Sequence, residues 1–136
     1  MTYALDSNII SYFLKNDNNV KQHFQSAINN NNPYAIPPLV CYEVKRWLKI
    51  RNATKQLQIF TDLYSDSVKS DMTADMWEKS VDLYVRLKLS GINIDDADIF
   101  IASYCIVNGY ILVTNNVKHY KGIDGLIIEN WKQLSV

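Results

Sequence analysis

Short apolar segments separated by helical patterns are the feature that most constrains the fold. The clearest is Tyr110–Val113, a continuous apolar run typical of a strand buried on both faces of a parallel sheet. Residues 3–5, 33–36 and 126–128 are further short strand candidates, the last at a sheet edge. Strands that alternate with helices predict an α/β fold, with helices flanking a central, mainly parallel sheet.

Six segments carry helical patterns. Thr73 is expected to cap the longest of them, and this helix should end before Gly91. Pro38 suits the first turn of another helix, and Gly109 marks the end of a third. The segments are residues 7–14, 20–28, 39–50, 54–64, 72–89 and 99–108. With no repeat and no long linker, a single domain over residues 1–136 is expected.

Composition and the N-terminal sequence indicate an intracellular globular protein. Hydrophobic residues make up 48% and charged residues 21%. No apolar run reaches the roughly 18 residues of a membrane span, and MTYALDSN lacks the features of a signal peptide. Cys41 and Cys105 lie in apolar surroundings without metal-ligand spacing, so reduced core cysteines are expected. These observations favour a cytoplasmic location without membrane contact.

Acidic residues stand at the edges of apolar runs in three separate places. Asp6 follows the first strand, Glu43 lies in a helical segment, and Asp95, Asp96 and Asp98 precede an apolar helix. Unpaired buried carboxylates are costly, and several together repel one another unless a cation or shared protons stabilise them. Mg²⁺ prefers oxygen ligands and often bridges carboxylates to a substrate phosphate. The pattern therefore indicates a metal-assisted phosphoryl-transfer site.

Each of these acids also has a purely structural interpretation. Asp6 could cap the helix that follows it, although Ser7 could take that role and leave Asp6 free. Glu43 could form an ion pair with Arg46, one helical turn further on. One acid of the group 95–98 is expected to be a cap, and first-turn acids interact favourably with the helix dipole.

Basic residues and histidines give weaker indications. The fourteen basic and fourteen acidic side chains cancel, so net charge gives no argument for a polyanionic partner. A basic row after Glu43 is either an exposed helix face or a contact to a phosphate backbone; it comprises Lys45, Arg46, Lys49, Arg51 and Lys55. His23 is expected at the surface, and His119 near the rim of the site. No GxSxG, Walker or dinucleotide-binding pattern is present.

Five segments together resemble the PIN-domain family, specifically the VapC-type toxin ribonucleases of type II toxin–antitoxin modules. They are YALDSNII, CYEV, GINIDDADIFIAS, GYILVTNNVKHY and GLIIENW, in the family's order and over nearly the whole chain. A single segment would be weak evidence, whereas five in order are specific. The resemblance implies a three-layer PIN-like fold and a metal-dependent endoribonuclease that uses Mg²⁺ or Mn²⁺.

The resemblance also assigns roles to individual acids. Asp6, Glu43 and Asp98 match the family's catalytic acids and would ligate the metal. Ser7 and Asn8 occupy the places of a usual Thr-Asn pair and would support the acids or position the substrate.

The chain departs from the family pattern at two positions. Asn116 falls where many relatives carry a fourth acid, and His119 where Asp or Glu is common. Both changes lower the negative charge of the site and put a fully acidic second metal position in doubt. Asp96, Lys45 and Arg46 are further candidates for contacts around the acids or with RNA.

Partners follow from the resemblance alone. It implies a small VapB-like antitoxin whose C-terminal segment blocks the nuclease groove, and a homodimer. Two alternatives remain open: a non-catalytic PIN-like module that binds RNA or protein, and an RNA-processing nuclease without an antitoxin. Retention of Asp6, Glu43 and Asp98 argues against the first alternative.

Overall fold

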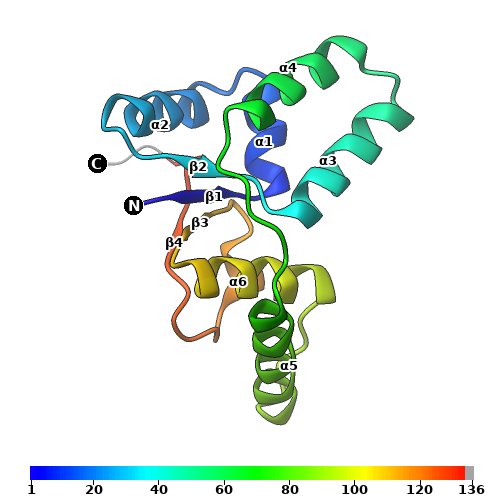
Figure 1. The fold of residues 1–136 in the computed structure, drawn as a ribbon, viewed down its shortest axis with the longest axis vertical. Coiled ribbons are helices and arrows are strands. Elements are labelled where there is room, and N and C mark those ends of the chain that lie inside the picture. The colour runs from blue at the N-terminus through cyan, green and yellow to red at the C-terminus, as the bar shows by residue number, and fades with distance from the viewer. Residues whose placement is uncertain (134–136) are drawn as a thin grey trace.

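Four parallel strands form the central sheet of the computed structural model, which describes residues 1–133 (Figure 1). The order across the sheet is β2-β1-β3-β4, and each neighbouring pair is parallel. The strands are β1 (Tyr3–Leu5), β2 (Tyr34–Ala35), β3 (Ile111–Val113) and β4 (Ile128–Glu129). The expected α/β class and parallel sheet are confirmed. The last three residues of the domain expected over 1–136 lie outside the described residues.

Helices on both sides of the sheet complete the expected three layers. In Figure 1, α1 to α4 lie on one side of the strands, and α5 and α6 on the other. The helices are α1 (Ser7–Leu14), α2 (Asn18–Asn29), α3 (Pro38–Ile50), α4 (Thr54–Ser65), α5 (Ala74–Leu89), α6 (Asp96–Asn108) and the short 3-10 helix η1 (Val117–Tyr120). Within residues 1–133, none of the helices has the length and apolarity needed to cross a membrane.

Several helix ends follow local signals in the sequence. The Thr73 side chain accepts a hydrogen bond from the Met76 N–H and caps α5, which ends before Gly91. Pro38 opens α3, where its missing N–H costs no intrahelical bond. Gly109 ends α6 with a φ of 71°, a left-handed conformation that glycine adopts without strain.

α2 and α6 begin earlier, and β4 later, than the sequence patterns predict. α2 starts at Asn18 because the Asp17 carboxylate accepts a hydrogen bond from the Val20 N–H and caps the helix. α6 starts at Asp96, with Asp95 in the cap position, so the first-turn acids belong to the helix. β4 covers 128–129 instead of 126–128, in register with the last two residues of β3.

Aromatic residues close one end of the core. Trp131 is only 2% exposed, and its ring packs edge-on against Tyr3 at a centroid distance of 5.1 Å, as expected for a residue covering the core. His23 is expected at the surface. In the structure it is half-buried, and its ring stacks on that of Trp131 at a centroid distance of 5.8 Å. Cys105 is buried and Cys41 half-buried, and both are free thiols as expected.

The strand order reverses at β1. The chain leaves β1 to form β2 on one side and later returns to its other side as β3. In open α/β sheets, ligands bind at the carboxyl ends of strands where the order reverses. Asp6 and Thr114 directly follow β1 and β3, and the Asp6 N–H donates to the Val113 carbonyl at 3.0 Å. The topology therefore places Asp6 where a ligand site is expected.

Candidate active site

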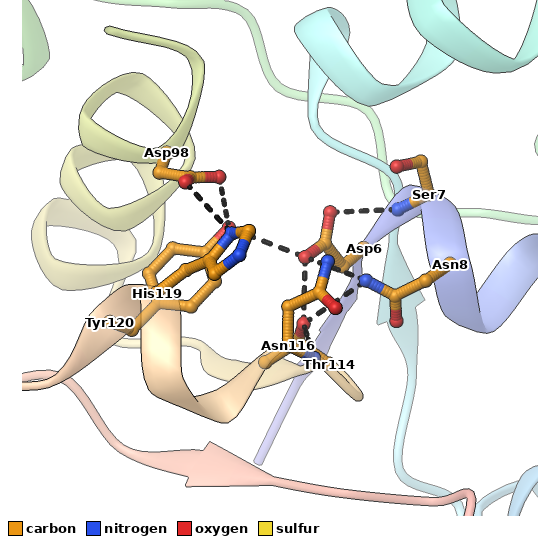
Figure 2. A network of polar contacts seen from close by, with 8 residues as sticks. All are labelled: Asp6, Ser7, Asn8, Asp98, Thr114, Asn116, His119 and Tyr120. Carbon is orange, nitrogen blue, oxygen red and sulfur yellow. Dashed lines mark hydrogen bonds and ion pairs between the residues drawn. The ribbon is translucent and has the colours of Figure 1, made fainter. Parts of the chain in front are cut away.

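Asp6 is a buried carboxylate that also caps α1. It is 5% exposed, and its Oδ1 accepts a hydrogen bond from the Ser7 N–H at 2.8 Å. Ser7 is therefore the first residue of the helix, and the alternative in which Ser7 caps the helix is wrong. Capping occupies one oxygen of Asp6, while the other, Oδ2, takes part in a separate network (Figure 2).

The second oxygen of Asp6 joins the ends of β1 and β3. It accepts a hydrogen bond from the Thr114 hydroxyl at 2.8 Å and one from the Asn8 amide at 3.3 Å. Asn8 also accepts from the Asn115 N–H at 2.8 Å, so its amide crosslinks the two strand ends. The Asn116 N–H donates to the Thr114 hydroxyl at 3.0 Å. Asp6 is thus held by both of the segments that follow the central strands.

Asp98 lies in the first turn of α6 and is contacted by two consecutive residues of η1. Its Oδ1 is 3.2 Å from the Tyr120 hydroxyl, and its Oδ2 is 3.2 Å from His119 Nδ1 (Figure 2). Burial raises the pKa of Asp98; the Tyr120 hydrogen bond and His119 oppose this shift, and the charges of Asp6 and Asp95 add to it. The carboxyl therefore lies where its negative charge is poorly solvated.

Tyr120 connects the two aspartates. Its hydroxyl also lies 3.3 Å from Asp6 Oδ2, and the residue is 2% exposed. Burial and the charges of Asp6 and Asp98 raise the pKa of Tyr120, so its hydroxyl retains its proton. Asp6 and Asp98, which are far apart in the sequence, thus meet at one buried hydroxyl.

Glu43 presents a buried oxygen without a partner. Within residues 1–133, its Oε1 is buried and has no hydrogen bond. Burial raises the pKa of Glu43; the charges of Asp6 and Asp98 raise it further, and Arg46 opposes the shift. The ion pair considered for Glu43 and Arg46 is not formed, because the guanidinium lies over the Tyr42 ring at 5.0 Å. An unsatisfied buried carboxylate oxygen requires an explanation, and a bound cation supplies one.

The structure does not bring every candidate to the acids. Asp96 is exposed in the first turn of α6 and has no hydrogen bond to them. Lys45 is exposed, and its ammonium lies over the Tyr64 ring at 5.7 Å. Instead, Lys118 and Lys121 line a hollow of about 410 Å³ together with Asp98 and His119.

Three contributors to the network were not predicted from the sequence. Thr114 and Asn115 follow a predicted strand, so the rule that ligand sites lie at carboxyl ends of strands would have found them. Tyr120 carries no such signal, because its contacts depend on η1, a four-residue turn without helical periodicity. Lys118, which lies in η1, and Lys121, which directly follows it, were likewise not predicted from the sequence.

The residues present fit a hard divalent cation. Among the described residues, no three His, Cys, Asp or Glu side chains lie close enough to enclose a metal ion by themselves. Mg²⁺ does not require such a cage, since it keeps several waters and uses one or two carboxylates with substrate phosphates. Asp6 and Asp98 supply two carboxylates at one hydroxyl, and Glu43 an unpartnered oxygen. The absence of a Cys/His set at the acids argues against a structural zinc site.

Comparison with known proteins assigns the family. The chain matches the PIN domain over residues 3–124. It is 32% identical to Ribonuclease VapC2 from Rickettsia felis over 138 residues, which covers 96% of this chain and 98% of that protein.

Solved structures agree with this match. The crystal structure of VapBC2 from Rickettsia felis bound to a promoter DNA fragment superimposes with a TM-score of 0.85 at 31% identity, covering 96% of this chain and 99% of that one. DNA-bound VapBC from Salmonella typhimurium gives a TM-score of 0.83 at 21% identity, covering 96% and 98%, which supports the fold. The chain belongs to the PIN-domain family. Within it, the resemblance to the VapC-type proteins is confirmed.

Proposed function

We propose that this protein is a metal-dependent endoribonuclease and the toxin of a VapBC-type toxin–antitoxin module. The observation that carries the proposal is the meeting of Asp6 and Asp98 at the Tyr120 hydroxyl, where the strand order reverses. A relative named as a ribonuclease, similar over nearly the whole chain, supports RNA as the substrate. We further propose that residues 1–136 fold as a single PIN domain.

Asp6 and Asp98 would hold Mg²⁺ or Mn²⁺ in this site, directly or through water, with Glu43 as a further candidate ligand. The bound ion would polarise a phosphoryl oxygen and lower the pKa of a water molecule. Glu43, with its raised pKa and unpartnered Oε1, would either ligate the ion or orient the attacking water and accept its proton. Water would add to phosphorus and lose a proton to Glu43 or to solvent, and the bond to the leaving ribose oxygen would break as that oxygen takes up a proton from solvent.

Neighbouring residues prepare the acids and the substrate for this reaction. Thr114 and Asn8 fix the Oδ2 atom of Asp6, and His119 contacts the Oδ2 atom of Asp98. Lys118 and Lys121 line the hollow beside Asp98 and would neutralise RNA phosphates flanking the cleaved bond.

The proposal includes two protein partners. A VapB-like antitoxin is supported by the VapBC2 complex from Rickettsia felis, in which the structurally similar chain occurs with its partner. A homodimer is supported by α5, whose outer face carries exposed apolar residues: Trp77, Val81, Tyr84, Val85 and Leu89. Exposed apolar patches of this kind commonly mark protein interfaces.

Cleavage of RNA by the purified protein tests the function directly. We expect endonucleolytic products with Mg²⁺ or Mn²⁺, none in excess chelator, and a yield from Asp98→Asn that is lower by orders of magnitude. Expression without an antitoxin should arrest growth, and mapped RNA ends should identify the cleavage sites. Binding of RNA without cleavage would favour the non-catalytic module, and cleavage without growth arrest would favour an RNA-processing nuclease.

A further inference from the structure

In residues 1–133, Tyr120 is the side chain whose hydrogen bonds reach both Asp6 and Asp98. Its hydroxyl lies 3.3 Å from Asp6 Oδ2 and 3.2 Å from Asp98 Oδ1, and dashed lines in Figure 2 mark both contacts. Packing alone does not require this hydroxyl. A phenylalanine would fill the same ring space without burying a polar atom that needs partners.

The geometry gives the hydroxyl a specific task. Asp6 follows β1 and Asp98 lies in α6, so their carboxylates come from different layers of the fold. The two carboxylates repel one another because both are negatively charged. A phenolic hydroxyl has one proton and donates to one oxygen at a time, which makes it a donor shared between the two carboxylates. The remaining oxygens are fixed independently, by the Ser7 N–H for Asp6 and by His119 for Asp98. Tyr120 therefore sets the position of one carboxylate relative to the other.

We propose that Tyr120 is a positioning residue that orients Asp6 and Asp98 for a divalent cation without itself touching the RNA. This inference rests on the proposed function, because it assigns a metal to the two acids. Hydrogen bonds to ligating carboxylates keep the ligands oriented, and their loss typically weakens metal affinity or activity by about 10–100-fold. We expect a loss of that size when the Tyr120 hydroxyl is removed.

The test is metal binding by Tyr120→Phe, with Tyr104→Phe as its matched control. Tyr104 is fully buried, and its hydroxyl bonds to Ser70 Oγ at 2.6 Å, away from the acids. Mn²⁺ is titrated calorimetrically into the metal-free full chain. We expect about 10–100-fold weaker binding for Tyr120→Phe and unchanged binding for Tyr104→Phe. Both variants lose a buried hydrogen bond, so a fall in melting temperature alone cannot separate them.

Cleavage kinetics provide a second readout. Because the buried hydroxyl does not reach substrate, Tyr120→Phe should lower kcat on an RNA oligonucleotide at fixed Mg²⁺ while KM stays within about twofold. A raised KM with unchanged kcat would mean that Tyr120 contacts RNA, which overturns the positioning role. Wild-type Mn²⁺ affinity in Tyr120→Phe overturns it as well.

Two non-natural side chains of nearly the same volume as tyrosine keep the test informative if Tyr120→Phe fails to fold. At position 120, 4-aminophenylalanine retains an N–H donor, whereas 4-fluorophenylalanine fills the space without donating. We expect near wild-type Mn²⁺ affinity for the first and the full loss for the second; equal affinities would overturn the inference. Failure of the proposed function gives a different result, since the wild-type protein would then neither bind Mn²⁺ nor cleave RNA.

Discussion

Asp98 fits a structural rule of helices and also the metal site that we propose. It lies in the first turn of α6, where an acid interacts favourably with the helix dipole, yet burial and Asp6 raise its pKa. Asp98→Asn keeps the side-chain volume and removes the charge. We expect RNA cleavage to fall by orders of magnitude while the melting temperature of the metal-free protein stays constant or rises. Initial rates and calorimetric melting curves measure the two effects.

Asp95 is the matched control for this change. It occupies the cap position of α6, is exposed, and makes no side-chain capping bond. Asp95→Asn should therefore cost at most about 0.3–1 kcal/mol of stability, through the helix dipole, and leave cleavage nearly intact. Near-wild-type cleavage by purified Asp98→Asn would show that the site assignment is wrong.

The raised pKa values of Glu43 and Asp98 predict how stability depends on pH. A carboxyl whose pKa is higher in the folded than in the unfolded state binds more protons when folded, so unfolding becomes easier as pH rises. The contribution of these two carboxyl groups to folding stability is fully present below their ordinary pKa of about 4. It is lost as pH rises through their folded-state pKa values. We expect the melting temperature of metal-free wild-type protein to fall across this window relative to that of Asp98→Asn. Added Mg²⁺ should raise it at neutral pH.

Among the elements, those with long periodic patterns were predicted from the sequence and the short turns were not. α5 has sixteen residues, a Thr73 cap and a following Gly91, so local signals define it. The run at 110–113 predicted β3 because a strand buried on both faces needs apolar residues throughout. η1 has four residues and no period, and the contact of Tyr120 with two acids arises only when η1 packs beside the end of β1 and the start of α6.

The position of η1 predicts where RNA is held. Lys118 and Lys121 line the hollow beside Asp98, whereas Lys45 and Arg46 are exposed on α3 and lie over aromatic rings. In an Asp98→Asn background, which binds without cleaving, Lys118→Ala with Lys121→Ala should weaken RNA binding and reduce its salt dependence. Each lost phosphate contact should lower the log–log salt slope by about 0.7 for single-stranded RNA.

Lys45→Ala with Arg46→Ala is the control, because both residues lie on α3. This pair removes the same number of charges from the exposed surface, and we expect a smaller change in slope. Fluorescence anisotropy over a salt series measures both pairs. The larger change in slope for the α3 pair would place the RNA track on that helix and contradict the assignment to the hollow lined by Lys118 and Lys121.

For the whole molecule, the outer face of α5 predicts how two copies assemble. The inner face of α5 is buried, but Val81 at the centre of its outer face is 57% exposed. The N-terminal half of this helix carries Asp75, Glu78 and Lys79, a net charge of −1, and the C-terminal half carries Asp82, Arg86 and Lys88, a net charge of +1. Antiparallel pairing about a two-fold axis near Val81 would bring each acidic half against a basic half and bury the apolar residues between them.

Val81→Glu places a charge at the centre of this interface and should convert the dimer to a monomer. Ile127→Glu is the control, since Ile127 is 63% exposed beside β4 and lies outside the α5 face. Light scattering after size exclusion should give twice the monomer mass for wild-type and Ile127→Glu, and the monomer mass for Val81→Glu. If Val81→Glu remains dimeric, another surface joins the subunits. Val81 lies on α5, whereas Asp6 follows β1 and Asp98 lies in α6. Loss of cleavage in a folded monomer would therefore mean that cleavage requires both copies.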